Sequence, residues 1–236
     1  MPRIRSPSSE SSDGLEPLLA EQLAYYRALA PHYGETAFPD HDEGALRAAA
    51  NELSGAIEGF RIAGDVLELA CGPGTWTELL VTGATTLTAV DAAPEMLGIA
   101  GGRIDDERVR FVQADIFDWV PDRAYDCVFF GFWLSHVPVE RFGPFWAMVA
   151  GALKPDGRVL FFDDAYRTAE ELIEGPEAST IRRRLGDGTT YRVVKVPHAP
   201  AELETSLRRL GWDISVHPTR GPFYWGAGSR ARPGRP

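Results

Sequence analysis

Two acidic residues and two glycines of the first half of the chain are spaced as a ligand site would need them. Glu68 lies inside one apolar run, Asp91 directly follows the next, and Gly72 and Gly74 lie in the turn between them. A buried carboxylate is costly unless it has polar partners, and glycines let a turn pass close beneath a ligand with positive φ. The helix start after such a turn offers unpaired N–H groups, and an acid in the position of Asp91 accepts two ribose hydroxyls. The spacing therefore predicts a nucleoside site.

A nicotinamide dinucleotide is one ligand that such a turn binds, and two residues argue against it. The fingerprint of that class has a third glycine three residues after the second, and Thr77 stands there. That class also needs no carboxylate four residues before the first glycine, where this chain has Glu68. Glu68 would repel a pyrophosphate and attract an ammonium or a sulfonium. The residues therefore favour a nucleoside that carries a positive charge.

A regular alternation of strands and helices must position these residues. Apolar runs rich in β-branched and aromatic residues predict buried strands at residues 65–70, 86–90, 109–114, 125–130 and 158–162. Helical patterns cover residues 15–29, 43–59, 75–81, 94–104 and 142–153. Strands that alternate with helices predict a parallel sheet with both faces covered.

The pattern changes after Asp164, where the chain predicts two hairpin strands, a helix and a final antiparallel pair of strands. These elements cover residues 182–185, 189–196, 199–210, 212–217 and 223–227. We therefore expect an α/β fold with a parallel sheet, an antiparallel last strand, helices on both faces and a hairpin inserted after the fifth strand.

One domain accounts for the chain between two polar ends. Residues 1–14 are rich in Ser and Pro and predict a disordered leader, and residues 229–236 predict a flexible tail. The domain then spans residues 15–228, with residues 165–198 as an inserted lid or dimer surface.

Composition excludes several classes of function. The 236 residues carry a formal charge of −10, which disfavours a nucleic-acid partner because phosphate binding depends on cationic groups. No apolar stretch is long enough for a membrane span. The two cysteines, Cys71 and Cys127, make neither a disulfide framework nor a metal cluster. We therefore expect a cytoplasmic protein with no metal, no nucleic acid and no membrane among its partners.

The motifs as a set resemble those of the class I S-adenosylmethionine-dependent methyltransferases. Residues 68–75, Glu-Leu-Ala-Cys-Gly-Pro-Gly-Thr, resemble motif I of that family, and residues 90–96, Val-Asp-Ala-Ala-Pro-Glu-Met, resemble its motif after the second strand. Residues 112–116, 125–128 and 153–158 resemble its adenine-flanking segment, its fourth strand and the turn before its fifth strand. The resemblance covers residues 20–228. It implies a Rossmann-like methyltransferase sheet and S-adenosylmethionine as the cofactor.

The resemblance also implies a role for each matched residue. Glu68 and the glycine turn would hold the methionine part of the cofactor, Asp91 the ribose and Asp115 the adenine amino group. Tyr26 and Tyr33 resemble a pattern by which an N-terminal helix closes over the cofactor, although an amphipathic core stripe would place tyrosines in the same way. The cofactor-binding residues that we expect are Tyr26, Tyr33, Glu68, Ala70, Gly72, Gly74, Asp91, Ala92, Met96, Asp115, Ile116, Gly131 and Phe132.

His136 and Asp164 are the candidate catalytic residues. His136 lies in the loop after the fourth predicted strand, where a base would remove a proton from the methyl acceptor. A histidine that only shapes the loop fits the same position. Asp163 and Asp164 end the fifth predicted strand, where one of them would bind the acceptor, unless they form a helix cap or a solvated pair. Nearby aromatic residues such as Trp133 suit a flat or apolar acceptor.

The expected function is methyl transfer to an O, N or S atom of a small molecule, in specialised metabolism, by a monomer or a homodimer. Two alternatives share the same cofactor motifs. One is an enzyme that uses the bound cofactor for cyclisation or decarboxylation, and the other is an inactive binding subunit.

Overall fold

The structure is a computed structural model that describes residues 12–35, 42–173, 175 and 178–232. The outer parts of the predicted leader and tail, residues 1–11 and 233–236, lie outside the described residues. Within the described ranges, no helix combines the length and the apolar character that a membrane span requires.

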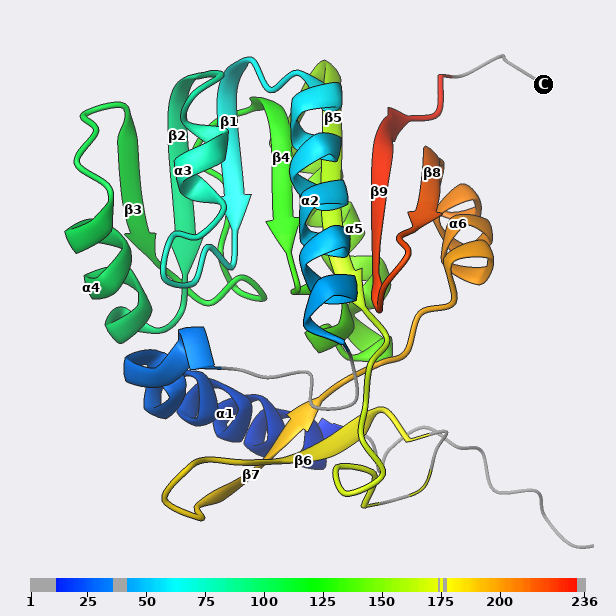
Figure 1. Cartoon of the computed structure of the whole chain (residues 1–236). Helices are drawn as coiled ribbons and strands as arrows, with labels where there is room; N and C mark the ends of the chain where they lie inside the picture. The colour runs from blue at the N-terminus through cyan, green and yellow to red at the C-terminus, as the bar shows by residue number, and fades with distance from the viewer. Residues whose placement is uncertain (1–11, 36–41, 174, 176–177, 233–236) are drawn as a thin grey trace, which may run out of the picture.

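One sheet of seven strands organises the molecule, in the order β3-β2-β1-β4-β5-β9-β8 (Figure 1). The strands are β1 (Gly64–Leu69), β2 (Ala84–Asp91), β3 (Val109–Gln113), β4 (Tyr125–Gly131), β5 (Leu153–Asp164), β8 (Trp212–Pro218) and β9 (Phe223–Arg230). The first five strands pair in parallel, and β9 runs antiparallel to both of its neighbours, β5 and β8. The predicted fold class is therefore confirmed, with β9 as the strand that reverses direction.

Helices cover both faces of this sheet because neighbouring strand residues point to opposite sides. Cys127 and Phe129 of β4 face one core, and Val128 and Phe130 face the other. The first core is closed by α2 (Glu43–Phe60), α3 (Thr77–Leu80) and α4 (Pro94–Arg103). The second is closed by α5 (Val139–Ala152) and α6 (Pro200–Arg209).

The remaining elements form a cover beyond the carboxyl ends of the parallel strands. Helix α1 (Ser12–Leu29) lies across these strand ends and continues into the short helix η1 (Ala30–Glu35) (Figure 1). The hairpin of β6 (Thr180–Arg184) and β7 (Thr190–Val194) is a separate two-stranded sheet that packs on the far side of α1. The predicted insertion after the fifth strand is thus a hairpin, and α1 lies between it and the main sheet.

Several boundaries differ from those predicted, and three of them concern the polar ends of the chain and the glycine turn. Helix α1 begins at Ser12, three residues before the predicted start and inside the predicted leader, because the ends of a helix are the part that a sequence pattern determines least well. Strand β9 reaches Arg230, inside the predicted tail, because Ser229 pairs with Arg158 and Asp213 across the sheet. Helix α3 spans only Thr77–Leu80, since the preceding residues belong to the glycine turn.

Candidate active site

β1 and β4 are neighbours at the centre of the sheet, and the chain leaves their carboxyl ends in opposite directions. β1 connects to β2 on one side, and β4 connects to β5 on the other. Open α/β sheets bind ligands at such a switch point. Ala70, after β1, and Phe132, after β4, both have left-handed backbones, with φ of 51° and 56°. Non-glycine residues in this region are strained, and such strain is concentrated at functional sites.

Asp91, at the end of β2, organises the floor of a cavity at this switch point. One of its carboxylate oxygens accepts the N–H of Gly72 at 2.8 Å, and the other accepts the N–H of Ala93 at 2.8 Å. Gly72 and Gly74 have φ of 54° and 81°, so the turn needs glycine at both places. Asp91 therefore joins the glycine turn to the start of α4 and still lines the cavity.

Glu68 lies beneath this floor. Its carboxylate is buried and accepts the hydroxyl of Thr77 at 2.7 Å. Burial raises the pKa of Glu68 to about 8, and the nearby charge of Asp91 adds to the rise. Glu68 is absent from the residues that line the cavity, and its hydrogen bond joins it to Thr77 at the start of α3, directly after the glycine turn.

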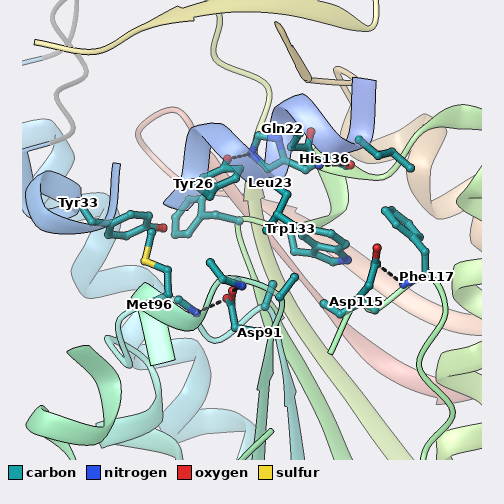
Figure 2. Close-up of a pocket in the computed structure, with 18 residues that line it drawn as sticks. Gln22, Leu23, Tyr26, Tyr33, Asp91, Met96, Asp115, Phe117, Trp133 and His136 are labelled. Atoms are coloured by element: carbon teal, nitrogen blue, oxygen red, sulfur yellow. Dashed lines mark hydrogen bonds between the residues drawn. The ribbon is translucent and has the colours of Figure 1, made fainter. Parts of the chain in front are cut away.

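One side of the cavity is a slot with an acid at its edge (Figure 2). Ile116 is buried and apolar, and Phe117 and Trp133 pack against each other with ring centroids 5.5 Å apart. Met96, also buried, lies on the opposite side of the cavity (Figure 2). The exposed carboxylate of Asp115 accepts the N–H of Phe117 at 2.9 Å. The slot is therefore shaped for a flat group with a polar edge.

The roof comes from α1 and η1. Leu19, Gln22, Leu23 and Tyr26 of α1 and Tyr33 of η1 point into the cavity (Figure 2). Burial raises the pKa of Tyr33 to about 12, and the charge of Asp91 contributes to the rise. The roof is therefore apolar apart from neutral hydroxyl and amide groups.

His136, in the short helix η2 (Leu134–His136), joins this roof to the loop after β4. Its Nδ1 lies 2.6 Å from the carbonyl oxygen of Val194, and its Nε2 lies 2.8 Å from the hydroxyl of Tyr26. Because a carbonyl can only accept, Nδ1 carries the proton and Nε2 accepts from Tyr26. Burial, together with the positive charges of Lys195 and Arg183, holds the pKa of His136 well below its usual value. The imidazole is therefore neutral, and both of its nitrogens are occupied.

Asp163 and Asp164 form a buried cluster at the end of β5. Asp163 accepts the N–H and the hydroxyl of Ser135, both at 2.7 Å. The ammonium of Lys195 lies 2.9 Å from Asp164 and 3.0 Å from the Ser135 hydroxyl. Burial raises the pKa of Asp163 to about 6 against the opposing charge of Lys195. This cluster anchors the segment after β7 to the core.

The structure brings most of the predicted residues together. Those that line the cavity are Tyr26, Tyr33, Ala70, Gly72, Asp91, Ala92, Met96, Asp115, Ile116, Gly131, Phe132 and His136. Glu68, Gly74 and Asp164 do not line it. Within the described part of the chain, no group of His, Cys, Asp or Glu residues is suited to hold a metal ion.

The prediction did not include Leu19, Gln22, Leu23, Ala93 and Phe117, which also line the cavity. Leu19, Leu23 and Tyr26 recur at helical spacing, which was the available signal. That stripe has the same pattern whether a helix covers a core or a cavity. No sequence pattern indicated that Gln22 lines the cavity.

Comparison with known proteins identifies the family. Residues 66–157 match the family model described as a methyltransferase domain. The chain is 40% identical to the protein in the solved DhpI–SAH complex, with 92% of this chain and 98% of that one covered and a TM-score of 0.76. This chain belongs to the S-adenosylmethionine-dependent methyltransferase family.

Two further proteins are similar to this methyltransferase. Trans-aconitate 2-methyltransferase of Streptomyces avermitilis is 29% identical over 211 residues, which are 81% of this chain and 73% of that protein. The 1,6-didemethyltoxoflavin-N1-methyltransferase of Burkholderia thailandensis has the same fold, with 20% identity, 97% and 94% of the two chains covered and a TM-score of 0.62.

The cavity of this methyltransferase fits S-adenosylmethionine. A carboxylate lies at each end, Asp91 beside the glycine turn and Asp115 at the slot, and apolar side chains lie between them. A diol-binding carboxylate, together with a slot for a flat group with a polar edge, suits a nucleoside.

Proposed function

We propose that this methyltransferase transfers the methyl group of S-adenosylmethionine to an oxygen of an acidic group on a small molecule. The proposal narrows the expectation of an O, N or S acceptor to acceptors that are already ionised. The observation that carries it is that no side chain lining the described cavity is placed to remove a proton.

The titratable groups of the cavity are the reason for this choice. They are Tyr26, Tyr33, Asp91, Asp115 and His136. Asp91 and Asp115 fit the cofactor, and burial raises the pKa of both tyrosines, which keeps them protonated. His136 is neutral, but its Nε2 accepts from Tyr26 and its Nδ1 donates to Val194. An alcohol needs a base to become a nucleophile, whereas a carboxylate is ionised at neutral pH.

Two cations lie near this side of the cavity, and each is paired with an acid, Lys195 with Asp164 and Arg183 with Glu171. Lys195 and Arg183 are the two cations whose charges lower the pKa of His136. Arg183 also lowers the pKa of Tyr26, against the stronger effect of burial. The relative named trans-aconitate 2-methyltransferase acts on an acid, as its name states.

The residues of this chain have three tasks in the reaction. S-adenosylmethionine supplies an electrophilic methyl group on a sulfonium. Asp91 and the glycine turn would orient the nucleoside, next to the strand ends where Ala70 and Phe132 have left-handed backbones. Helix α1 covers the cavity and excludes water, and the neutral roof leaves the acceptor oxygen as the nucleophile.

A panel of acceptors tests the proposal. Small organic acids, trans-aconitate included, are compared with their primary amides and alcohols, with SAH release measured by chromatography and the product by mass spectrometry. We expect methyl esters from acids and no product from the matched amides and alcohols. Faster turnover of an alcohol or an amide would overturn the choice of acceptor. A product without an added methyl group would favour cofactor-assisted cyclisation or decarboxylation instead.

A further inference from the structure

Gln22 is a buried polar residue on the cavity side of α1, and both ends of its amide are used. Its Oε1 accepts the N–H of Val194 at 2.9 Å, and its Nε2 donates to the carbonyl oxygen of His136 at 3.3 Å. These partners fix the orientation of the amide, because an N–H must meet oxygen and a carbonyl must meet nitrogen. Gln22 therefore hydrogen-bonds to the backbone of two segments that lie more than a hundred residues further along the chain.

His136 completes a closed circuit with the same segments. Its Nδ1 donates to the carbonyl oxygen of Val194, and its Nε2 accepts the hydroxyl of Tyr26. The circuit thus runs from Gln22 to Val194, on to His136 and Tyr26, and returns to α1, which carries both Gln22 and Tyr26. Figure 2 shows Gln22, Tyr26 and His136 gathered at the roof of the cavity. Each of its four hydrogen bonds has a matched donor and acceptor.

The circuit joins α1, β7 and η2, and η2 directly follows the loop that carries Phe132 and Trp133 into the cavity. Among the described residues, α1 also makes ion pairs at the surface, such as Arg27 with Glu95, and Glu21 accepts the N–H of Arg192. Exposed ion pairs contribute little. The Lys195 cluster anchors the hairpin to the core, but it does not touch α1. The circuit is therefore a buried polar connection that positions the roof, beside the apolar packing of Tyr25 on the hairpin.

We propose that Gln22 and His136 are positioning residues that hold α1 closed over the cofactor, and that neither removes a proton from the acceptor. The proposal rests on the proposed function only in taking this cavity as the cofactor site. Closure adds to the affinity for the cofactor, because the apparent dissociation constant increases as the closed fraction decreases. A base, in contrast, would change turnover and leave cofactor affinity as it is.

SAH binding by calorimetry tests this without any acceptor. Gln22→Leu leaves the N–H of Val194 and the carbonyl of His136 unpaired, and we expect the dissociation constant of SAH to rise by about tenfold or more. His136→Asn should give a similar rise, and the double variant should be little worse than either single one, because each change opens the same circuit. Glu16→Gln, at a position of α1 whose side chain is 69% exposed, is the matched control and should bind SAH like the wild type.

Unchanged SAH affinity in Gln22→Leu and His136→Asn, with turnover lost in His136→Asn alone, would overturn the proposal and make His136 a base. Fully additive effects would also overturn it. No SAH binding by the wild type would instead contradict the cofactor assignment, and a failed acceptor panel with the expected SAH results would affect only the proposed acceptor.

The tautomer of His136 gives a test on the wild type, in case a variant does not fold. Nitrogen NMR of labelled histidine distinguishes Nδ1–H from Nε2–H. We expect a neutral ring with its proton on Nδ1 and no titration near pH 6.5. A ring with its proton on Nε2, or one that titrates at its ordinary pKa, would contradict the circuit. Tyr26→Phe removes one hydroxyl from the circuit and should weaken SAH binding less than Gln22→Leu.

Discussion

Hydrogen bonds hold both the floor of the cavity, at Gly72 and Asp91, and its roof, at Gln22 and Tyr26. The two sets differ in how far apart in the sequence the bonded residues lie. Asp91 accepts from Gly72, 19 residues away, and from Ala93, two residues away. Gln22 bonds to residues 114 and 172 positions away. The floor is thus formed largely within one βαβ unit, whereas the roof forms only when three distant segments meet.

This difference predicts that changes at the floor abolish cofactor binding, whereas changes at the roof weaken it. Local hydrogen bonds fix the shape of the floor before any ligand arrives. The roof must open for the cofactor to enter, so its contacts add to affinity only when it is closed.

The largest effect is expected for Asp91→Ala. This change leaves the N–H groups of Gly72 and Ala93 without their acceptor and removes the carboxylate that fits the ribose. Since each unpaired buried group costs about 1–3 kcal/mol, we expect SAH affinity to fall by about a hundredfold or more. Calorimetry measures it, with Asp156→Ala at an exposed ion pair as the control. A loss smaller than that of Gln22→Leu would reverse the ranking of floor and roof.

Gly131→Ala tests how tightly the strand end beneath the cavity is packed. A Cβ at Gly131 would lie 3.0 Å from the indole ring of Trp76, which must then move. Overpacking of this kind costs about 1–3 kcal/mol, and we expect the free energy of unfolding in urea to fall by that amount. Gly143→Ala, in α5 with no atom within 4 Å of the added Cβ, is the control and should not destabilise the protein. Equal stability of the two variants would contradict this packing.

The pKa of Glu68, about 8, predicts a pH dependence at the floor. Folded, unliganded enzyme holds a proton on Glu68 that the unfolded chain releases at its ordinary pKa of about 4.3, so this group lowers stability as pH rises through that window. A cofactor ammonium nearby would lower the pKa and release the proton. We therefore expect the affinity for SAH to rise between about pH 6 and pH 8. Calorimetry over that range measures it, and Glu68→Gln should remove the dependence. Affinity that is independent of pH in the wild type would show that Glu68 is not coupled to the ligand.

The smallest effect is expected for Arg27→Ala in the roof. The ion pair between Arg27 and Glu95 joins α1 to α4, but both side chains are exposed, at 51% and 40%. Such pairs contribute about 0–1 kcal/mol. We expect SAH affinity within about threefold of the wild type, measured in the same calorimetry. A larger loss would mean that surface charges, and not the buried circuit, keep the roof closed.

Much of the floor was predictable from sequence because its determinants are local. A tight turn after the first strand indicates Gly72 and Gly74, and a place directly after the second predicted strand indicates Asp91. The role of Glu68 was predicted less well, since a pattern shows that an acid is buried but not whether it lines the cavity or lies beneath it. His136 lines the cavity, but its two hydrogen bonds, which oppose a role as a base, involve the distant residues Tyr26 and Val194.

The sequence alone predicted the α/β sheet, the succession of strands and helices along the chain, and the glycine turn between two acids, because strand and helix periods and turn residues act over a few positions. Only the tertiary structure decided which segments cover that turn and that His136 is neutral with both of its nitrogens hydrogen-bonded. Gln22, His136 and Val194 have no local pattern in common, and their hydrogen bonds exist only when α1, η2 and β7 are packed together. The physical reason is that a hydrogen bond between distant residues depends on how whole elements pack, which no short stretch of residues specifies.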